Sequence, residues 1–210
     1  AGARNVISGN VTVAVSLHDV GTSGNVVEGN YIGTDAAGEV AIGNHQDAVL
    51  LNLGASGNTI GGTTEGAGNV IAGNFGNGVN VMGAGTSNNT VAGNFIGTDA
   101  TGAAALGNTS AGVAIGSGAT GNLVGGTAEL ARNVISGNLS NGVQILGSGT
   151  SGNVVEGNVI GLDADGTEAL GNVGIGVVVA SSASGNTIGG TDPGAGNVIA
   201  DNGQAGVVVG

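Results

Sequence analysis

The tripeptide Asn-Val-Ile recurs at one constant interval along the whole chain. It begins at Asn5, Asn69, Asn133 and Asn197, so successive copies stand 64 residues apart with no insertion between them. A period this strict is typical of units that stack on one another rather than of a chain folded around one globular core. We therefore interpret residues 1–210 as a single solenoid made of the repeats 5–68, 69–132 and 133–196 and the partial repeat 197–210.

Short alternating segments separated by Gly, Ser, Thr and Asn fill each repeat. The second repeat holds Gly78-Val-Asn-Val-Met, Asn89-Thr-Val-Ala-Gly and Asn94-Phe-Ile-Gly-Thr, and a similar triplet returns about 32 residues later. Each segment predicts a brief strand, so a repeat holds two turns of a coil with three strands per turn. Period-2 alternation then places the following residues inside, matched one turn apart: Val79, Val81, Val91 and Ile96 with Val113, Ile115, Val124 and Ile135.

Helices and separate hairpins fit the sequence less well than a parallel coil. Glycine recurs every few residues, and each one costs a helix interior about 1 kcal/mol. Gly-Asn prevails over the Asn-Gly order that marks tight hairpin turns. A parallel coil, in which each strand pairs with the strand one turn later, explains both the short strands and the constant period. The fold class predicted is therefore all-β, a parallel β-helix.

Composition narrows the partners that such a coil can have. The chain carries 14 acidic residues against two cations, a net charge of −12, which argues against nucleic acid and anionic membrane surfaces. It has no cysteine, which removes disulfides and thiolate chemistry but leaves the compartment open. The first residues do not resemble an export signal, and no apolar run is long enough to span a bilayer. We therefore expect neither nucleic-acid binding nor membrane insertion.

Asparagine stands at equivalent corners of successive turns. Side-chain amides stacked at the strand spacing of about 4.8 Å can bond to the amides above and below, and Asn tolerates the left-handed backbone of a sharp corner. We expect structural Asn ladders in two sets of equivalent residues, the first being Asn10, Asn74, Asn138 and Asn202, and the second Asn30, Asn94 and Asn158.

Several phrases resemble a known family over the whole chain. Asn-Val-Val-Glu-Gly-Asn, Ile-Gly-Thr-Asp-Ala, Ala-Ser-Gly-Asn-Thr-Ile-Gly-Gly-Thr and Gly-Ala-Gly-Asn-Val-Ile are similar to repeats of bacterial right-handed parallel β-helix proteins of the pectate-lyase-like superfamily. The resemblance implies a right-handed coil. Members with Gly/Asn-rich arrays are mostly extracellular or cell-surface proteins, whereas others are polysaccharide lyases, hydrolases or epimerases. The motif specifies the fold and leaves the function open.

A polysaccharide-degrading or polysaccharide-binding role is the first alternative to a structural one. The lyases of the superfamily use Arg or Lys beside acidic Ca²⁺ ligands, but this chain has no Lys, and Arg4 and Arg132 occupy a variable turn position. Hydrolases need converging carboxylates. Asp35, Asp99 and Asp163 recur once per repeat, about 10 Å apart along the axis, which predicts a regular acidic column. We therefore expect no catalytic residue.

One copy of this acidic segment has the partial pattern of a calcium loop. Asp163, Asp165 and Glu168 place oxygen ligands around Gly166, whereas the other two copies lack the second Asp. These three residues are the candidate Ca²⁺ ligands, with a solvated Asx-type turn as the alternative. No other cofactor is expected.

The remaining side chains of interest fall into columns. His18 and His45 have no second His at metal-binding spacing and are expected at the surface. Stacked packing is expected for two columns of large side chains, Tyr31 with Phe95 and Val159, and Val11 with Phe75 and Leu139. Ice binding is a minor alternative, since Thr22, Thr86 and Thr150 repeat only every second turn.

A structural role is the function that these observations favour. The last strand-like segment, residues 206–210, has an inward pattern with no polar cap after it, so an open end of the coil is expected to pair with another unit. Head-to-tail contacts of this kind do not close and generate filaments. We expect an extracellular or cell-surface rod that stacks head to tail or forms the stalk of a larger surface protein.

Overall fold

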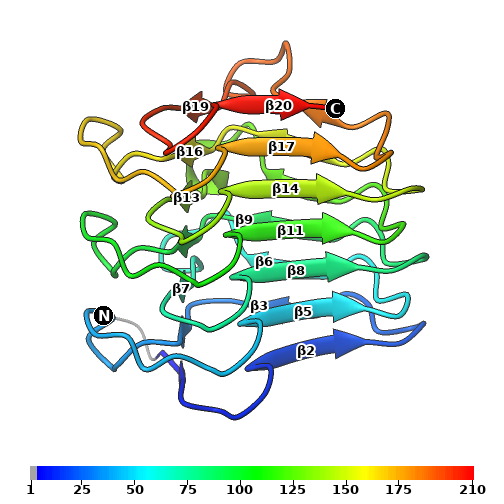
Figure 1. The fold of residues 1–210 in the computed structure, drawn as a ribbon. Helices are drawn as coiled ribbons and strands as arrows, with labels where there is room; N and C mark the ends of the chain where they lie inside the picture. The colour runs from blue at the N-terminus through cyan, green and yellow to red at the C-terminus, as the bar shows by residue number, and fades with distance from the viewer. Residues whose placement is uncertain (1–3) are drawn as a thin grey trace.

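Residues 4–210 are described by a computed structural model, in which they form three parallel sheets (Figure 1). Sheet A contains β1 (Val6–Ile7), β4 (Tyr31–Ile32), β7 (Val70–Ile71), β10 (Phe95–Ile96), β13 (Val134–Ile135), β16 (Val159–Ile160) and β19 (Val198–Ile199). Sheet B contains β2 (Val15–His18), β5 (Val49–Asn52), β8 (Val79–Met82), β11 (Val113–Gly116), β14 (Val143–Leu146), β17 (Val177–Ala180) and β20 (Val207–Val209). Sheet C contains β3 (Val26–Val27), β6 (Thr59–Gly61), β9 (Thr90–Ala92), β12 (Leu123–Gly125), β15 (Val154–Glu156) and β18 (Thr187–Ile188).

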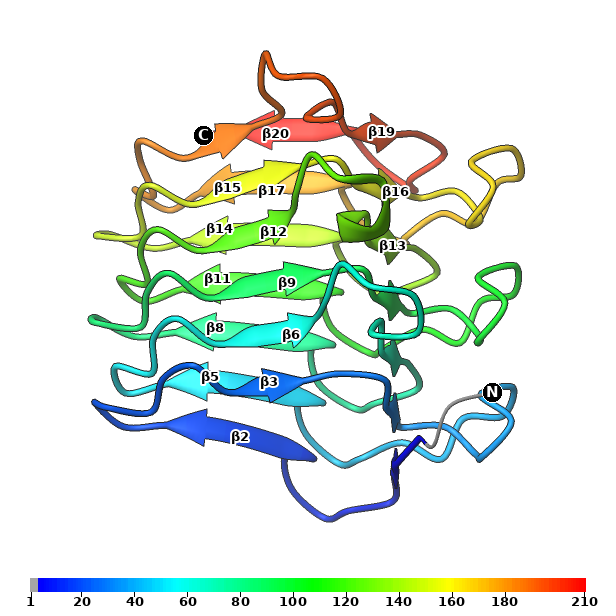
Figure 2. The same ribbon diagram turned by 180° about the vertical axis from the view of Figure 1, so that it is seen from behind.

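The chain winds through sheets A, B and C in turn, so each turn contributes one strand to each sheet, as predicted. In Figure 1 the strands of sheet B run from left to right at the front, and Figure 2 shows sheet C running back on the far side while the chain rises. The coil is therefore a right-handed parallel β-solenoid. Residues 1–3 of the predicted solenoid lie outside the described residues.

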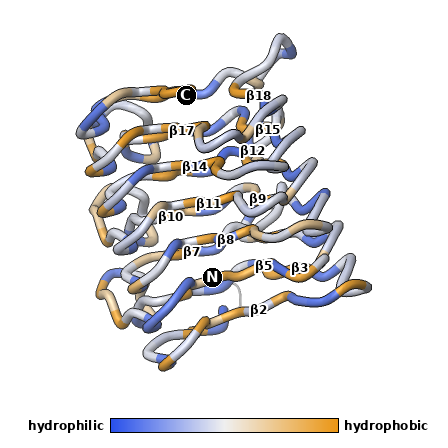
Figure 3. Tube along the Cα trace, turned by 45° about the vertical axis from the view of Figure 1, so that its right-hand side comes forward, coloured by the Kyte–Doolittle hydropathy of each residue, from blue (hydrophilic) through white to orange (hydrophobic). Residues whose placement is uncertain are grey.

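The core is a narrow column of stacked apolar side chains. In sheet A the second residue of every strand is Ile and faces inward, as Ile71, Ile96 and Ile135 do with no exposed surface. Sheet B contributes two inward residues per strand and sheet C contributes one, which leaves room for little beyond Val, Ile and Leu. Figure 3 shows hydrophobic residues returning along the strands at every level. The eight residues predicted to face inward are all buried, which confirms the period-2 reading.

The two turns of a repeat are unequal, which differs from the expectation of about 32 residues per turn. Equivalent Asn corners are 25 and then 39 residues apart on entering sheet A. They alternate between 30 and 34 residues on leaving it, and between 31 and 33 residues on entering sheet C. Long loops cause the alternation, because one turn of each repeat has its insertion before the strand of sheet A and the other has it after that strand.

These insertions form two columns of loops on either side of sheet A. The Asp loops (33–43, 97–107 and 161–171) leave sheet A and close on themselves through short antiparallel bridges such as Thr98 with Ala105. The Thr loops (62–68, 126–132 and 190–196) precede sheet A. One of them holds the 3₁₀ helix η1 (Glu129–Ala131), and no helix within residues 4–210 is long and apolar enough to cross a membrane.

Glycine is required where a strand of sheet A meets its neighbours most closely. Gly97 ends β10 with φ +91°, and a Cβ there would overlap the carbonyl oxygen of Ser136 and the side chain of Asn138. We expect Gly97→Ala to lower the free energy of unfolding by at least about 2 kcal/mol, because the backbone of two turns would have to shift. Gly196 has nothing within 4 Å of its Cβ position, so Gly196→Ala is the matched control, expected within about 0.5 kcal/mol in denaturant titrations. Equal losses for both variants would contradict this packing argument.

Candidate functional site

Asparagine side chains connect every turn to the next at three corners of the coil. At each step Nδ2 donates to Oδ1 of the equivalent Asn one turn later, as in Asn69 to Asn94 (2.9 Å) and Asn94 to Asn133 (3.0 Å). The backbone N–H of Asn69 donates to the same Oδ1 of Asn94 at 3.0 Å, and Asn69 Nδ2 also donates to the carbonyl oxygen of Val27 at 2.8 Å. Each amide therefore serves three turns, which satisfies polar groups that have no access to solvent.

The predicted Asn sets are confirmed as parts of longer ladders. Asn10, Asn74, Asn138 and Asn202 alternate with Asn44, Asn108 and Asn172 where the chain leaves sheet A. Asn30, Asn94 and Asn158 alternate with the Asn-Val-Ile residues Asn5, Asn69, Asn133 and Asn197 where it enters. A third ladder, not predicted, enters sheet C through Asn25, Asn58, Asn89, Asn122, Asn153 and Asn186. The sequence signal for this ladder was the Asn that directly precedes each strand of sheet C.

The Asp of each Asp loop binds the backbone of its own loop. Asp163 Oδ1 accepts the N–H of Thr167 (2.8 Å) and of Glu168 (3.1 Å). Asp35 and Asp99 accept the equivalent pairs of amides at 2.9 to 3.2 Å. The loops also contact one another along the axis, since Ala164 N–H donates to Gly102 O at 3.0 Å. The predicted acidic column is thus a column of capped turns.

The proposed calcium ligands lie on one such loop. Asp163 is buried beneath the loop with Oδ1 occupied by amides, whereas Asp165 and Glu168 are exposed. Within residues 4–210, no group of three or more His, Cys, Asp or Glu is arranged to hold a metal ion. The calcium site stays a prediction, tested by Ca²⁺ titration: an unchanged melting temperature for the chain and for Asp165→Ala would exclude it.

Acid is expected to release these turns. Hydrogen bonds from the backbone N–H of Glu168 and Thr167 hold the pKa of the Asp163 carboxyl below its ordinary value of 3.8. A carboxyl with a lowered pKa stabilises the folded turn above that ordinary value, and the stabilisation is lost as the pH falls through the lowered pKa. We expect hydrogen-exchange protection of the Thr167 and Glu168 amides at neutral pH, weakening only as the pH falls below 3.8 toward the lowered pKa.

Substitutions in this loop separate the carboxyl effect from general acid sensitivity. Asp163→Ala should remove the protection of the two amides at all pH values. Asp165→Ala, in the same exposed loop, should leave the protection as it is. Equal protection of the two amides at neutral pH in the unmodified chain and in Asp163→Ala would contradict the role of the carboxylate.

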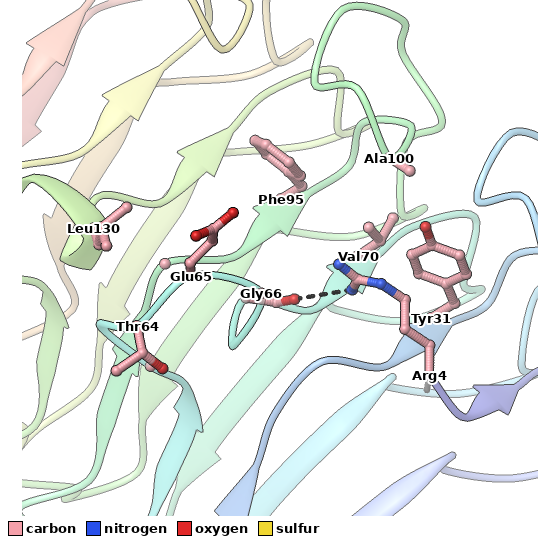
Figure 4. A pocket seen from close by; sticks show the side chains of 12 residues that line it. Arg4, Tyr31, Thr64, Glu65, Gly66, Val70, Phe95, Ala100 and Leu130 are labelled. Atoms are coloured by element: carbon pink, nitrogen blue, oxygen red, sulfur yellow. Dashed lines mark hydrogen bonds between the residues drawn. The ribbon is translucent and has the colours of Figure 1, made fainter. Parts of the chain in front are cut away.

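A groove runs along the outer face of sheet A between the two columns of loops, and it consists of two adjoining cavities. The first, of about 200 Å³, is shown in Figure 4, with Tyr31, Val70 and Phe95 from sheet A flanked by Ala100 of an Asp loop and by Thr64 and Glu65 of a Thr loop. The second, of about 300 Å³, continues over Phe95 and Val134 toward Ala164. Leu130 lines both cavities and is 53% exposed. The groove is thus mostly apolar, with acidic residues at its edge.

Both cations of the chain lie in this groove. Arg4 packs over the ring of Tyr31, with 4.9 Å from its guanidinium carbon to the ring centroid, and its Nη1 donates to the carbonyl oxygen of Gly68 at 3.3 Å. Arg132 lines the second cavity beside Glu129. The position is a variable turn position, as predicted, but spacing alone could not show that the two Arg share a surface with Tyr31 and Phe95.

An apolar ridge stands beside the Asp loops, at the corner between sheets A and B. It consists of one residue per turn directly after the exit ladder: Val11, His45, Phe75, Thr109, Leu139 and Val173. Val11, Phe75, Leu139 and Val173 are 75, 59, 55 and 59% exposed. Stacked packing was predicted for Val11 with Phe75 and Leu139 and stays a prediction, whereas the structure places His45 against Phe75, with their rings edge to face at 5.4 Å. His18 and His45 are at the surface, as expected.

The threonines weighed for ice binding do not form an outward array. Thr86 and Thr150 are fully buried, and their hydroxyl groups donate to the carbonyl oxygens of Met82 and Leu146, each at 3.0 Å. Thr22 donates to the carbonyl oxygen of His18 at 2.6 Å. These three hydroxyls stabilise the turns between sheets B and C and are not arranged to face a flat ligand.

Comparisons with protein-family models, with curated proteins and with solved structures found no match to this chain. The structure by itself establishes a parallel β-solenoid with three sheets and Asn ladders.

Proposed function

We propose that this protein is a non-enzymatic structural protein, an extracellular rod made of a parallel β-helix. The observation that carries the proposal is the use of the repeated polar groups. The recurrent Asn side chains are bonded from turn to turn, and Asp35, Asp99 and Asp163 each cap their own loop. Side chains committed in this way to the backbone of every repeat favour a scaffold over a single catalytic centre.

The same contacts support stacking of units along the axis. Each repeat presents to the next the same set of Asn amides and strand edges, so repeats can stack on one another along the axis. Such a contact between separate molecules would be heterologous and would produce filaments. The other form of the proposal is a stalk within a larger surface protein, and the resemblance of the repeats to bacterial pectate-lyase-like β-helices supports an extracellular or cell-surface place for both.

A polysaccharide-binding or polysaccharide-degrading β-helix is the second candidate. The observation that favours it is the groove, where Tyr31 and Phe95 lie near the two Arg. Sugar rings pack well on aromatic faces, and guanidinium groups bind carboxylates. Ice binding is the weakest candidate, because Thr86 and Thr150 are buried.

Electron microscopy of the purified chain at increasing concentration tests the structural proposal. Filaments whose length grows with concentration are expected if units stack head to tail. Short single rods at every concentration would exclude the filament form and leave the stalk. Release of oligosaccharides from any soluble polysaccharide would overturn the non-enzymatic proposal as a whole.

A further inference from the structure

The apolar ridge is a rigid surface feature. The backbone N–H groups of His45, Phe75 and Leu139 each donate to the carbonyl oxygen of the ladder Asn one turn below, at 2.9 Å. The ridge side chains are therefore held on a fixed backbone while more than half of each large apolar one faces solvent. Exposed apolar side chains that recur along one edge of a chain of net charge −12 favour an interaction site there.

The ridge and the groove have the same axial period. Val11, Phe75 and Leu139 are one repeat apart, and so are Tyr31 and Phe95 of the two cavities. Because both features belong to one coil, a ridge laid along a groove meets a cavity at every repeat in the same register. A second copy of the chain has this match built in.

The ridge of one molecule cannot enter its own groove. After β4 the chain passes through an Asp loop and returns at Asn44, directly before His45, so the Asp loops separate sheet A from the ridge. Figures 1 and 2 show these loops projecting from the edge of the coil. A contact between the two features must therefore join different molecules, with a different surface on each side, and such a contact extends into an open row unless its rotation closes a ring.

The edge of the groove is acidic, whereas the ridge residues carry no carboxylate. Glu65 and Glu129 stand at the edge of the groove, and carboxylates of the Asp loops stand beyond it. The six ridge residues include no carboxylate, so the ridge itself adds no negative charge where it meets the acidic edge. Leu130, Phe95 and Ala100 offer apolar surface for it to cover.

We propose that the apolar ridge of one copy docks in the sheet A groove of a second copy, so that rods associate side by side into rows. This inference rests on the proposed structural role, because it assigns to a rod the contact by which rods bundle. It adds a lateral contact to the axial stacking considered above.

Two variants remove one side of the contact each. Phe75→Asp with Leu139→Asp places charge on the ridge, and Leu130→Glu places charge at the edge shared by the two cavities. All three positions are more than half exposed, so the fold should persist, as circular dichroism and melting would verify. Val20→Asp is the matched control, since Val20 is 88% exposed and belongs to neither surface.

Sedimentation velocity over a range of concentrations gives the readout. The unmodified chain and Val20→Asp should associate, and each of the two variants alone should lose at least about tenfold in association constant. Mixed together, the two variants should form one-to-one lateral pairs that add no further rods sideways, because the intact groove of the first receives the intact ridge of the second. This complementation is specific to a contact between two different surfaces.

Other results would overturn the inference. Self-association of the Leu130→Glu variant together with no complex in the mixture would assign the contact to ridge against ridge. Filaments one rod wide, unchanged by any variant, would remove the lateral contact and leave the proposed structural role intact. A soluble polysaccharide that binds the unmodified chain but not Leu130→Glu, with no self-association, would assign the groove to a carbohydrate instead.

Discussion

Ile135→Asp is expected to unfold the middle of the solenoid. Ile135 has no exposed surface and stacks in sheet A between Ile96 and Ile160. A carboxylate there would be surrounded by apolar side chains with no cation near it, which costs several kcal/mol, about 4 kcal/mol or more. Turns of a solenoid are stabilised mainly by their neighbours, so the damage should spread to the turns above and below before it reaches the rest of the coil.

Limited proteolysis and guanidinium titration would measure this effect. We expect early cleavage in the loops next to β13 for Ile135→Asp and a loss of only about 1 kcal/mol for Ile135→Val, which keeps the side chain apolar. Ala103→Asp introduces the same charge on an exposed part of an Asp loop and should change the free energy of unfolding by less than about 0.5 kcal/mol. Protease resistance equal to that of Ala103→Asp would contradict a dry, continuous core at Ile135.

The core was predictable because its signal is local. Alternation along four residues, as in Val79 to Met82, is enough to decide which side chains face inward, and the repeat then extends the assignment to every turn. Pairing of each strand with the strand one turn later follows from the same interval. The three-sheet coil could therefore be predicted without knowing how the loops fold.

The unequal turns could not be derived from the interval. A period of 64 residues fixes the sum of two turns but not its division, and in Gly-rich sequence both insertions resemble the turns that flank them. Whether sheet A is entered after 25 or 39 residues depends on where each loop folds back, which short antiparallel bridges decide. The groove was missed for the same reason, because Arg4, Phe95 and Leu130 come from three segments that only the loops bring together.

Substitutions in the segment from Asp99 to Asn108 are expected to differ in their effect from one position to the next. Mild effects are expected at its exposed positions, such as Ala103 and Ala104. Asn108 instead is fully buried and donates to Asn138 Oδ1 at 3.0 Å, and a Cβ at Gly102 would press on Ala164. Part of this loop segment therefore belongs to a packed corner of the coil.

Asn94→Leu is expected to be as damaging as a charge in the core, although it makes the chain more apolar. Asn94 Oδ1 accepts the backbone N–H of Asn69 (3.0 Å) and its Nδ2 (2.9 Å). Asn94 Nδ2 donates to the carbonyl oxygens of Ile60 (2.9 Å) and Ala92 (3.0 Å) and to Asn133 Oδ1 (3.0 Å). Leucine would remove these five buried hydrogen bonds and leave the backbone N–H of Asn69 without a partner; at about 1 to 3 kcal/mol for each group that is left unsatisfied, the loss should reach about 4 kcal/mol.

The same substitution at Asn52 is expected not to lower the free energy of unfolding. Asn52 ends β5 on the outer face of sheet B, and its Oδ1 is buried with no hydrogen-bond partner among the described residues. Leu146 occupies the matching place on β14, so the face already accepts leucine. Asn52→Leu removes an unsatisfied oxygen and should leave stability unchanged or raise it by up to about 1 kcal/mol. Guanidinium titrations of the two variants would compare their free energies of unfolding. A loss for Asn94→Leu alone would show that the Asn ladder stabilises the coil. Equal losses for both variants would contradict this role and indicate only that Asn suits the backbone of the corners.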